Sequence, residues 1–281
     1  MSVLVAGSLH LDVVLRAPHL PRLDETVTGS AVDYVFGGKG GNQAVAASRM
    51  GADVSLAGRI GQDHFGEMIR EALVTAGVDI GQLQQDPGAS GMSAAIVEDG
   101  GEYGAVIVSG ANARIDANAI AMPIGTSLVL LQNEVPEAVN LTVARHAQRA
   151  GAAVWLNAAP SRPLSSALVE TLDLLIVNRV EAAFYAGSTP DVRTLTTLGP
   201  DGVSFDGTIH PGHRVDLVSA HGAGDMFVGG LAACVAAGAA LPDAVPFAQA
   251  AAALHVSTPL AARSALDGDA VRRFLVAQDS R

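Results

Sequence analysis

The sequence has 281 residues, of which 49% are hydrophobic and 16% charged, so it can bury a large core and is not a disordered chain. The net charge of −11, with no local cluster of lysine and arginine, excludes nucleic acid as a partner. Cys234 is the only cysteine, which rules out an intramolecular disulfide and a cysteine zinc site. Without a signal-like segment or a run of eighteen apolar residues, we expect a cytoplasmic protein that does not enter membranes.

Short β-branched runs alternate with alanine-rich amphipathic segments along most of the chain. This pattern predicts crossover units built around a mainly parallel sheet. In chain order, the expected core strands are residues 3–6, 54–57, 128–132, 154–157, 174–177 and 194–197. The expected helices are residues 41–50, 64–76, 136–150 and 223–237, with one more after Pro242.

Two segments, residues 11–36 and 91–108, interrupt this alternation. In the second, the apolar runs 92–97 and 103–108 flank an Asp-Gly-Gly sequence at Asp99, which predicts a hairpin. Neither segment fits a crossover between parallel strands. We therefore expect a single domain over residues 1–281 in which the two insertions form a small separate sheet that closes over a ligand as a lid.

The densest motif is the glycine-rich run 37–43, in which four glycines surround Lys39 just before a predicted helix. Glycine lets the backbone approach a ligand closely, and a helix N-terminus offers unpaired N–H groups. A plain flexible turn is the alternative interpretation of this run alone. It is not a phosphate-binding Walker loop, since no Gly-Lys-Ser or Gly-Lys-Thr is present.

A second motif, residues 221–225, leads into the helix expected at 223–237. Its small residues Gly222, Ala223 and Gly224 can form an anion hole of backbone amides, and the carboxylate of Asp225 beside it can accept a hydroxyl proton. A Gly-Asp helix cap is the alternative interpretation of this motif alone.

Together the two motifs resemble the two signatures of the ribokinase-type, or PfkB, family of carbohydrate kinases. The resemblance runs from about Val3 to Val256 and includes further blocks in the family's order, at residues 7–12, 24–29, 110–112, 131–134, 156–160 and 197–202. It implies a three-layer α/β sandwich with a mostly parallel central sheet and a small β-sheet lid. The implied activity is ATP-dependent transfer of the γ-phosphate to a sugar hydroxyl, with ribose to ribose 5-phosphate as the best match.

The resemblance also assigns roles to individual residues. Asp225 would be the catalytic base, with Gly222, Ala223 and Gly224 as the anion hole. The sugar would be bound by His10, Asp12, Gly38, Lys39, Asn42 and Glu134. The nucleotide would contact Asn157, Asn178, Thr197, Gly199 and Gly202, with Mg²⁺ held largely through water near Glu181. Family members often form dimers through their lids, which implies a possible homodimer here.

Three departures from the family pattern carry expectations of their own. Ser219 replaces an aspartate that helps bind a monovalent activating cation, and the loop at Thr258 lacks an expected glycine, so potassium should activate weakly or not at all. His10 replaces an asparagine at the sugar site with a titratable ring. The segment between residues 187 and 197 is roughly twenty residues shorter than the family pattern, too short for a full crossover helix.

Several alternatives remain open on the sequence. The substrate could be another pentose, a ketohexose or a nucleoside, and the chain could be a degenerate sugar-binding or regulatory member with little turnover. A dinucleotide-dependent oxidoreductase is disfavoured because no Gly-x-Gly-x-x-Gly loop follows the first predicted strand.

Overall fold

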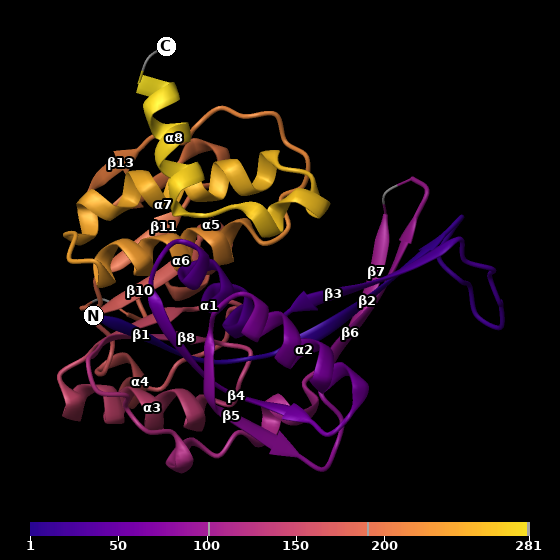
Figure 1. Cartoon of the computed structure of the whole chain (residues 1–281), viewed down its shortest axis with the longest axis horizontal. Coiled ribbons are helices and arrows are strands. Elements are labelled where there is room, and N and C mark those ends of the chain that lie inside the picture. Colours follow the sequence, from indigo (N-terminus) through magenta and orange to yellow (C-terminus); the bar gives the residue numbers. More distant parts are fainter. Residues whose placement is uncertain (101, 190, 280–281) are drawn as a thin grey trace.

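A sheet of nine strands runs through the part of the chain that the computed structural model describes, residues 1–100, 102–189 and 191–279 (Figure 1). Its strand order is β13-β12-β11-β10-β9-β8-β1-β4-β5. The parallel strands are β1 (Ser2–Ala6), β4 (Asp53–Gly61), β5 (Asp79–Asp86), β8 (Thr126–Gln132), β9 (Ala153–Asn157), β10 (Leu174–Asn178) and β11 (Thr194–Thr197). Two short antiparallel strands, β12 (Val203–Phe205) and β13 (Thr208–His210), complete one edge.

Helices cover both faces of this sheet, which explains why its central strands β1 and β8 each contain at least four consecutive apolar residues. In β1, Val3 and Val5 join one core cluster while Leu4 and Ala6 join the other, and all four are fully buried. One face is covered by α1 (Lys39–Arg49), α2 (His64–Thr75), α6 (Ala223–Ala236) and α7 (Leu241–Ser257), with α8 (Gly268–Asp279) packed outside α7. The other is covered by α3 (Glu137–Ala150), α4 (Ser166–Val169) and α5 (Arg179–Tyr185), with the 3₁₀ turns η1 (Gly110–Arg114) and η2 (Ala117–Ala119). Two further 3₁₀ turns are η3 (Gly199–Asp201) and η4 (Leu260–Ala265).

A second sheet of four strands extends away from the main body (Figure 1). Its order is β3 (Ala31–Gly37), β2 (His10–Ala17), β6 (Gly91–Glu98), β7 (Tyr103–Val108). The hairpin predicted at residues 91–108 is confirmed as β6 and β7, although Gly101 in its turn lies outside the described residues. The α/β fold with a small separate sheet is therefore as the sequence predicted.

The structure differs from the predicted elements mainly at the edges of the main sheet. The strand β5 was not expected, because five of its eight residues are polar and an edge strand does not need the continuous apolar pattern of a buried one. The helix α5 was also missed, because it is only seven residues long and begins directly at the end of β10. It supplies a short helix for the crossover to β11 ahead of Gly187, so the shortened segment that follows needs no crossover helix. The described residues between Gly187 and Thr194 contain no helix of their own, and Pro190 lies outside them.

The strand order creates a natural binding position. The chain proceeds from β1 to β4 on one side and later returns to β8 on the other, so the loops after β1 and β8 diverge. In open α/β sheets such a reversal leaves a crevice at the carboxyl ends of the strands. Within the described residues, no helix is both long and apolar enough to cross a membrane.

Candidate active site

Asp225 lies in the first turn of α6 with its side chain almost fully buried, at 8% exposure. Its Oδ2 accepts a hydrogen bond from Asn42 Nδ2 at 3.1 Å, and its Oδ1 accepts one from Gln43 Nε2 at 3.0 Å. Burial raises the pKa of the Asp225 carboxyl, because desolvation of the charged form outweighs the nearby Lys39 charge and the two amide donors. The result is a carboxylate held in one orientation with a strengthened affinity for a proton.

Gln43 is fully buried and connects Asp225 to the end of the main sheet. Its Nε2 also donates to Asn157 Oδ1 at 2.9 Å, and its Oε1 accepts from Gln132 Nε2 at 2.8 Å. The sequence analysis did not select Gln43 as a site residue. The available signal was a single long polar side chain on the alanine-rich buried side of α1, where an amide needs partners.

Glu134, just after β8, joins the glycine-rich loop to the loop after β1. Its Oε2 accepts from Ser8 Oγ at 2.5 Å and from the Lys39 backbone N–H at 2.8 Å. The close approach of the glycine-rich loop to the loop after β1 depends on Gly40, since a Cβ there would lie 2.6 Å from backbone atoms of Gly7 and Ser8. These contacts bring the N-terminus of α1 against the ends of β1 and β8, as the predicted sugar site requires.

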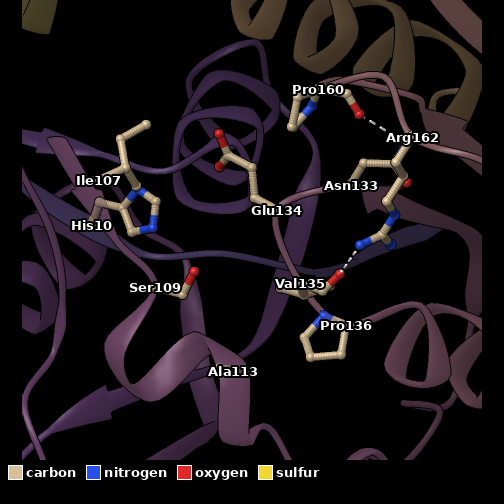
Figure 2. Close-up of a pocket in the computed structure, with 10 residues that line it drawn as sticks. All are labelled: His10, Ile107, Ser109, Ala113, Asn133, Glu134, Val135, Pro136, Pro160 and Arg162. Atoms are coloured by element: carbon tan, nitrogen blue, oxygen red, sulfur yellow. Dashed lines mark hydrogen bonds between the residues drawn. The ribbon is translucent and has the colours of Figure 1, made fainter. Parts of the chain in front are cut away.

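A cavity of about 340 Å³ opens beside these loops, with His10 and Glu134 on its wall (Figure 2). Its remaining lining residues are Ile107, Ser109, Ala113, Asn133, Val135, Pro136, Pro160 and Arg162. His10 is 5% exposed, and its Nε2 has no hydrogen-bond partner among the described residues. Asp12 lies two positions further along β2, hence on the same face of the lid sheet, and its Oδ1 accepts from Ser93 Oγ at 2.5 Å. His10 of the second sheet and Glu134 at the end of β8 thus lie on the same cavity.

A second cavity of about 460 Å³ lies at the N-terminus of α6. Three residues predicted to contact a nucleotide, Thr197, Gly199 and Gly202, line it together with Ala223 and Gly224. The other walls are mostly apolar, and the sequence analysis missed them because they come from α6, α7 and the segment before α6. They include Leu217, Phe227, Gln249, Ala252, Ala253 and Val256. A mostly apolar cavity that reaches the N-terminus of a helix suits a heteroaromatic base joined to phosphates.

A short chain of contacts links the start of α6, on the second cavity, to Glu134 on the first. Gly224 lines the second cavity, and the next residue, Asp225, is held by Asn42 from the glycine-rich loop whose Lys39 binds Glu134. Gly222 begins α6 with φ of 78°, a left-handed conformation that glycine adopts without strain. Asp225 therefore adjoins the second cavity through Gly224 and is connected to the first only through Asn42, the Lys39 N–H and Glu134.

Three other predicted residues have structural partners. Asn178 caps α5, because its Oδ1 accepts from the Val180 and Glu181 N–H groups, each at 2.9 Å. Glu181 completes the capping box by accepting from the Asn178 N–H at 2.8 Å through Oε2. Asn157 donates to the Ile176 carbonyl at 3.1 Å and accepts from Gln43. None of the three is among the residues that line the two cavities described above.

Comparison with known proteins places this geometry in a family. The model of the pfkB family carbohydrate kinases matches residues 1–267. The chain is 32% identical to a ribokinase of Bacillus subtilis over 271 residues, which cover 91% of this chain and 92% of the relative. The structure superposes with a TM-score of 0.88 on ribokinases of Thermotoga maritima and Arabidopsis thaliana, at 26% and 25% identity. These matches cover 98% of this chain in both cases, and 99% and 98% of the respective structures. The family expected from the two glycine motifs is confirmed, and the chain belongs to the pfkB family of carbohydrate kinases.

Proposed function

We propose that this protein transfers the γ-phosphate of ATP to a hydroxyl of ribose, giving ribose 5-phosphate and ADP. The observation that carries the proposal is the buried Asp225 at the N-terminus of α6, which is bound by Asn42 of the glycine-rich loop and directly follows Gly224 on the wall of the mostly apolar cavity. The similarity to ribokinases supports the choice of sugar, and the Arabidopsis ribokinase was solved in complex with ribose and ATP.

In the proposed reaction, Asp225 acts as the general base. A sugar hydroxyl is a poor nucleophile at neutral pH, so its proton must leave as its oxygen bonds to the γ-phosphorus and the bond to the β-phosphate oxygen breaks. The proton moves to Asp225, whose pKa is raised by burial. The N–H groups of Gly222, Ala223 and Gly224 at the N-terminus of α6 stabilise the charge on the transferring group.

The sugar is proposed to lie between the lid and the N-terminus of α1. Glu134 has one carboxylate oxygen bound to Ser8 and Lys39, which fixes the group while leaving its other oxygen for a sugar hydroxyl. Gly38, Lys39 and Asn42 contribute from the glycine-rich loop, and Asp12 with His10 from β2. The lid consists of residues 11–36 and 91–108, and its closure over the sugar would exclude water from the reacting groups.

The nucleotide is proposed to occupy the second cavity, with its base between the apolar walls. Thr197, Gly199 and Gly202 would contact it, while Asn157 and Asn178 stay close through the strand ends that carry them. Among the described residues, no three acidic, histidine or cysteine side chains gather into a metal site. Mg²⁺ keeps several waters and is bound through phosphate oxygens and one or two carboxylates, and Glu181 is the carboxylate proposed here. The ion would supply charge neutralisation on the phosphates.

The test is an ADP-release assay with purified protein, ATP, Mg²⁺ and a panel of ribose, other pentoses, ketohexoses and nucleosides. We expect the highest kcat/KM for ribose, and a reaction without sugar gives the background. A higher kcat/KM for another member of the panel would refute ribose as the substrate. If no sugar releases ADP although calorimetry detects sugar binding, the chain is a sugar-binding protein with little turnover.

A homodimer formed through the lid is a further part of the proposal. The strand register places Leu15, Val32, Tyr34, Val106 and Val108 on one face of the lid sheet, and all five are exposed. A second copy of the sheet would bury this apolar face. We also propose a cytoplasmic location, where ATP is available and a chain with a single cysteine needs no oxidising compartment.

A further inference from the structure

Arg263 is a buried cation next to the proposed anion hole. It lies in η4 with 6% of its surface exposed. Its Nη2 donates to the Ser219 carbonyl at 2.9 Å, Nη1 to the His221 carbonyl at 3.0 Å, and Nε to the Thr258 carbonyl at 3.0 Å. One guanidinium therefore gathers carbonyl oxygens from two segments that are distant in sequence, the loop before α6 and the end of α7.

The charge of Arg263 is not neutralised by a carboxylate. Within the described residues it forms no ion pair, although burying an arginine is costly unless its donors are satisfied. Backbone carbonyl groups accept the hydrogen bonds of its N–H donors instead. Converging carbonyl oxygens carry partial negative charge and separate unless a cation stands between them. Arg263 thus holds the 219–221 segment through its charge as well as its shape.

His255 extends this contact to the first residue of the hole. Its Nε2 lies 3.1 Å from Arg263 Nη1 and 2.9 Å from the His221 carbonyl. Burial lowers the pKa of His255. The guanidinium only donates and the His221 carbonyl only accepts, so the ring tautomer decides which of the two Nε2 contacts is the hydrogen bond. A Cβ on Gly222 would lie 3.0 Å from the same nitrogen, so the ring packs directly against Gly222.

We infer that Arg263 is a positioning residue for phosphoryl transfer, a tethered cation that fixes residues 219–221 and thereby aims the amides of Gly222, Ala223 and Gly224. It lies between the Ser219, His221 and Thr258 carbonyls, in the two loops where the family resemblance implies a monovalent cation. This explains how a site with Ser219 in place of a carboxylate can keep its loop ordered. The inference rests on the proposed kinase function, because the amides are taken to stabilise the transferred phosphoryl group.

The test compares the wild type with Arg263→Ala, Arg263→Lys and a matched control, Arg272→Ala, which removes an exposed arginine paired with Asp269. At constant ionic strength, wild-type turnover should be the same in potassium, sodium and tetramethylammonium chloride. Arg263→Ala should lose at least about tenfold in kcat, because the amides are no longer aimed, while KM for the sugar changes by less than about threefold. Arg263→Lys should keep an intermediate rate, and the control should match the wild type.

Chemical rescue separates positioning from general damage to the fold. Guanidinium chloride at about 20 mM, far below denaturing concentrations, should restore part of the activity of Arg263→Ala, while tetramethylammonium should not. Hydrogen exchange of amides 219–224 should rise in Arg263→Ala and fall again with guanidinium. This second measurement needs no turnover, so it tests Arg263 even if the protein phosphorylates none of the sugars offered.

Three results would overturn the inference. A saturable potassium requirement of the wild type would show that a dissociable cation, rather than Arg263, orders residues 219–221. An Arg263→Ala protein with kcat within about threefold of the wild type would show that the loop does not need the charge. Unchanged exchange of amides 219–224 in that variant would do the same. If Arg263→Ala does not fold, the wild-type cation comparison and the rate of Arg263→Lys decide the matter. A loss of at least about tenfold in kcat in Arg263→Lys, as large as that expected for Arg263→Ala, would count against a role for the charge.

Discussion

Replacing Asp225 with asparagine removes the proposed base while keeping the shape of its side chain. General base catalysis contributes about 10²- to 10⁴-fold, so we expect kcat to fall by that factor, or about 3–5 kcal/mol of transition-state stabilisation. The sugar cavity and the contacts of Glu134 are untouched, so sugar affinity should change little. The assays are steady-state ADP release and calorimetric sugar titration.

Stability of the same variant can be estimated from its contacts. The carboxylate accepts from both Asn42 and Gln43, whereas an asparagine offers one oxygen and leaves one donor unpaired, at a cost of about 1–3 kcal/mol. The opposite effect is the removal of a buried charge. Because burial raises the pKa of Asp225, its ionised form destabilises the fold above its ordinary pKa, and this penalty disappears as the pH falls through the raised value. The two effects oppose each other, so Tm should move by only about a few degrees.

The pH profile gives an independent check on the same residue. The acidic limb of kcat/KM in the wild type should lie above the range of an ordinary aspartate, since the free enzyme must lose the Asp225 proton to act. Asp269→Asn, at an exposed ion pair on α8, is the matched control and should leave the profile unchanged. A Asp225→Asn enzyme with kcat within about tenfold of the wild type would remove Asp225 from the role of base.

The remaining predictions concern the sugar, the metal and the lid. His10→Asn should shift kcat/KM among the sugars, and an unchanged preference would leave His10 as a packing residue. Glu181→Gln keeps a side chain that can cap α5 but removes the charge, so the Mg²⁺ concentration for half-maximal rate should rise, and no change would assign Glu181 to the cap alone. Val106→Glu should give a monomer in light scattering while Ile124→Glu, on an exposed loop, does not, and a dimer in both would place the interface elsewhere.

The family and the general architecture could be predicted from local patterns. Continuous apolar strands such as β1 and β8, amphipathic helices between them and the Asp-Gly-Gly hairpin each carry a signal within a short window. The two glycine motifs are equally local, since close backbone approach and a helix N-terminus need particular residues at adjacent positions. These features could therefore be predicted from the sequence without knowledge of any tertiary contact.

The edge elements and the walls of the nucleotide cavity were not predictable in this way. The strand β5 is recognised by its pairing with β4 rather than by its own polar sequence. Phe227, Ala252 and Val256 look like ordinary helix residues until α6 and α7 pack together and leave a cavity between them. Such walls are defined by the relative placement of elements, which a short window of sequence does not contain.

The sequence by itself determined which chemical groups are present: a carboxylate after small residues, a glycine-rich loop, and a serine where the family often has an aspartate. The tertiary structure decided which side chains hold these groups in position. Gln43 reaches Asp225 across 182 positions, and Arg263 reaches Ser219 across 44. Both side chains are buried polar groups, whose partners are found only when distant segments fold against each other and must satisfy every donor that water no longer reaches.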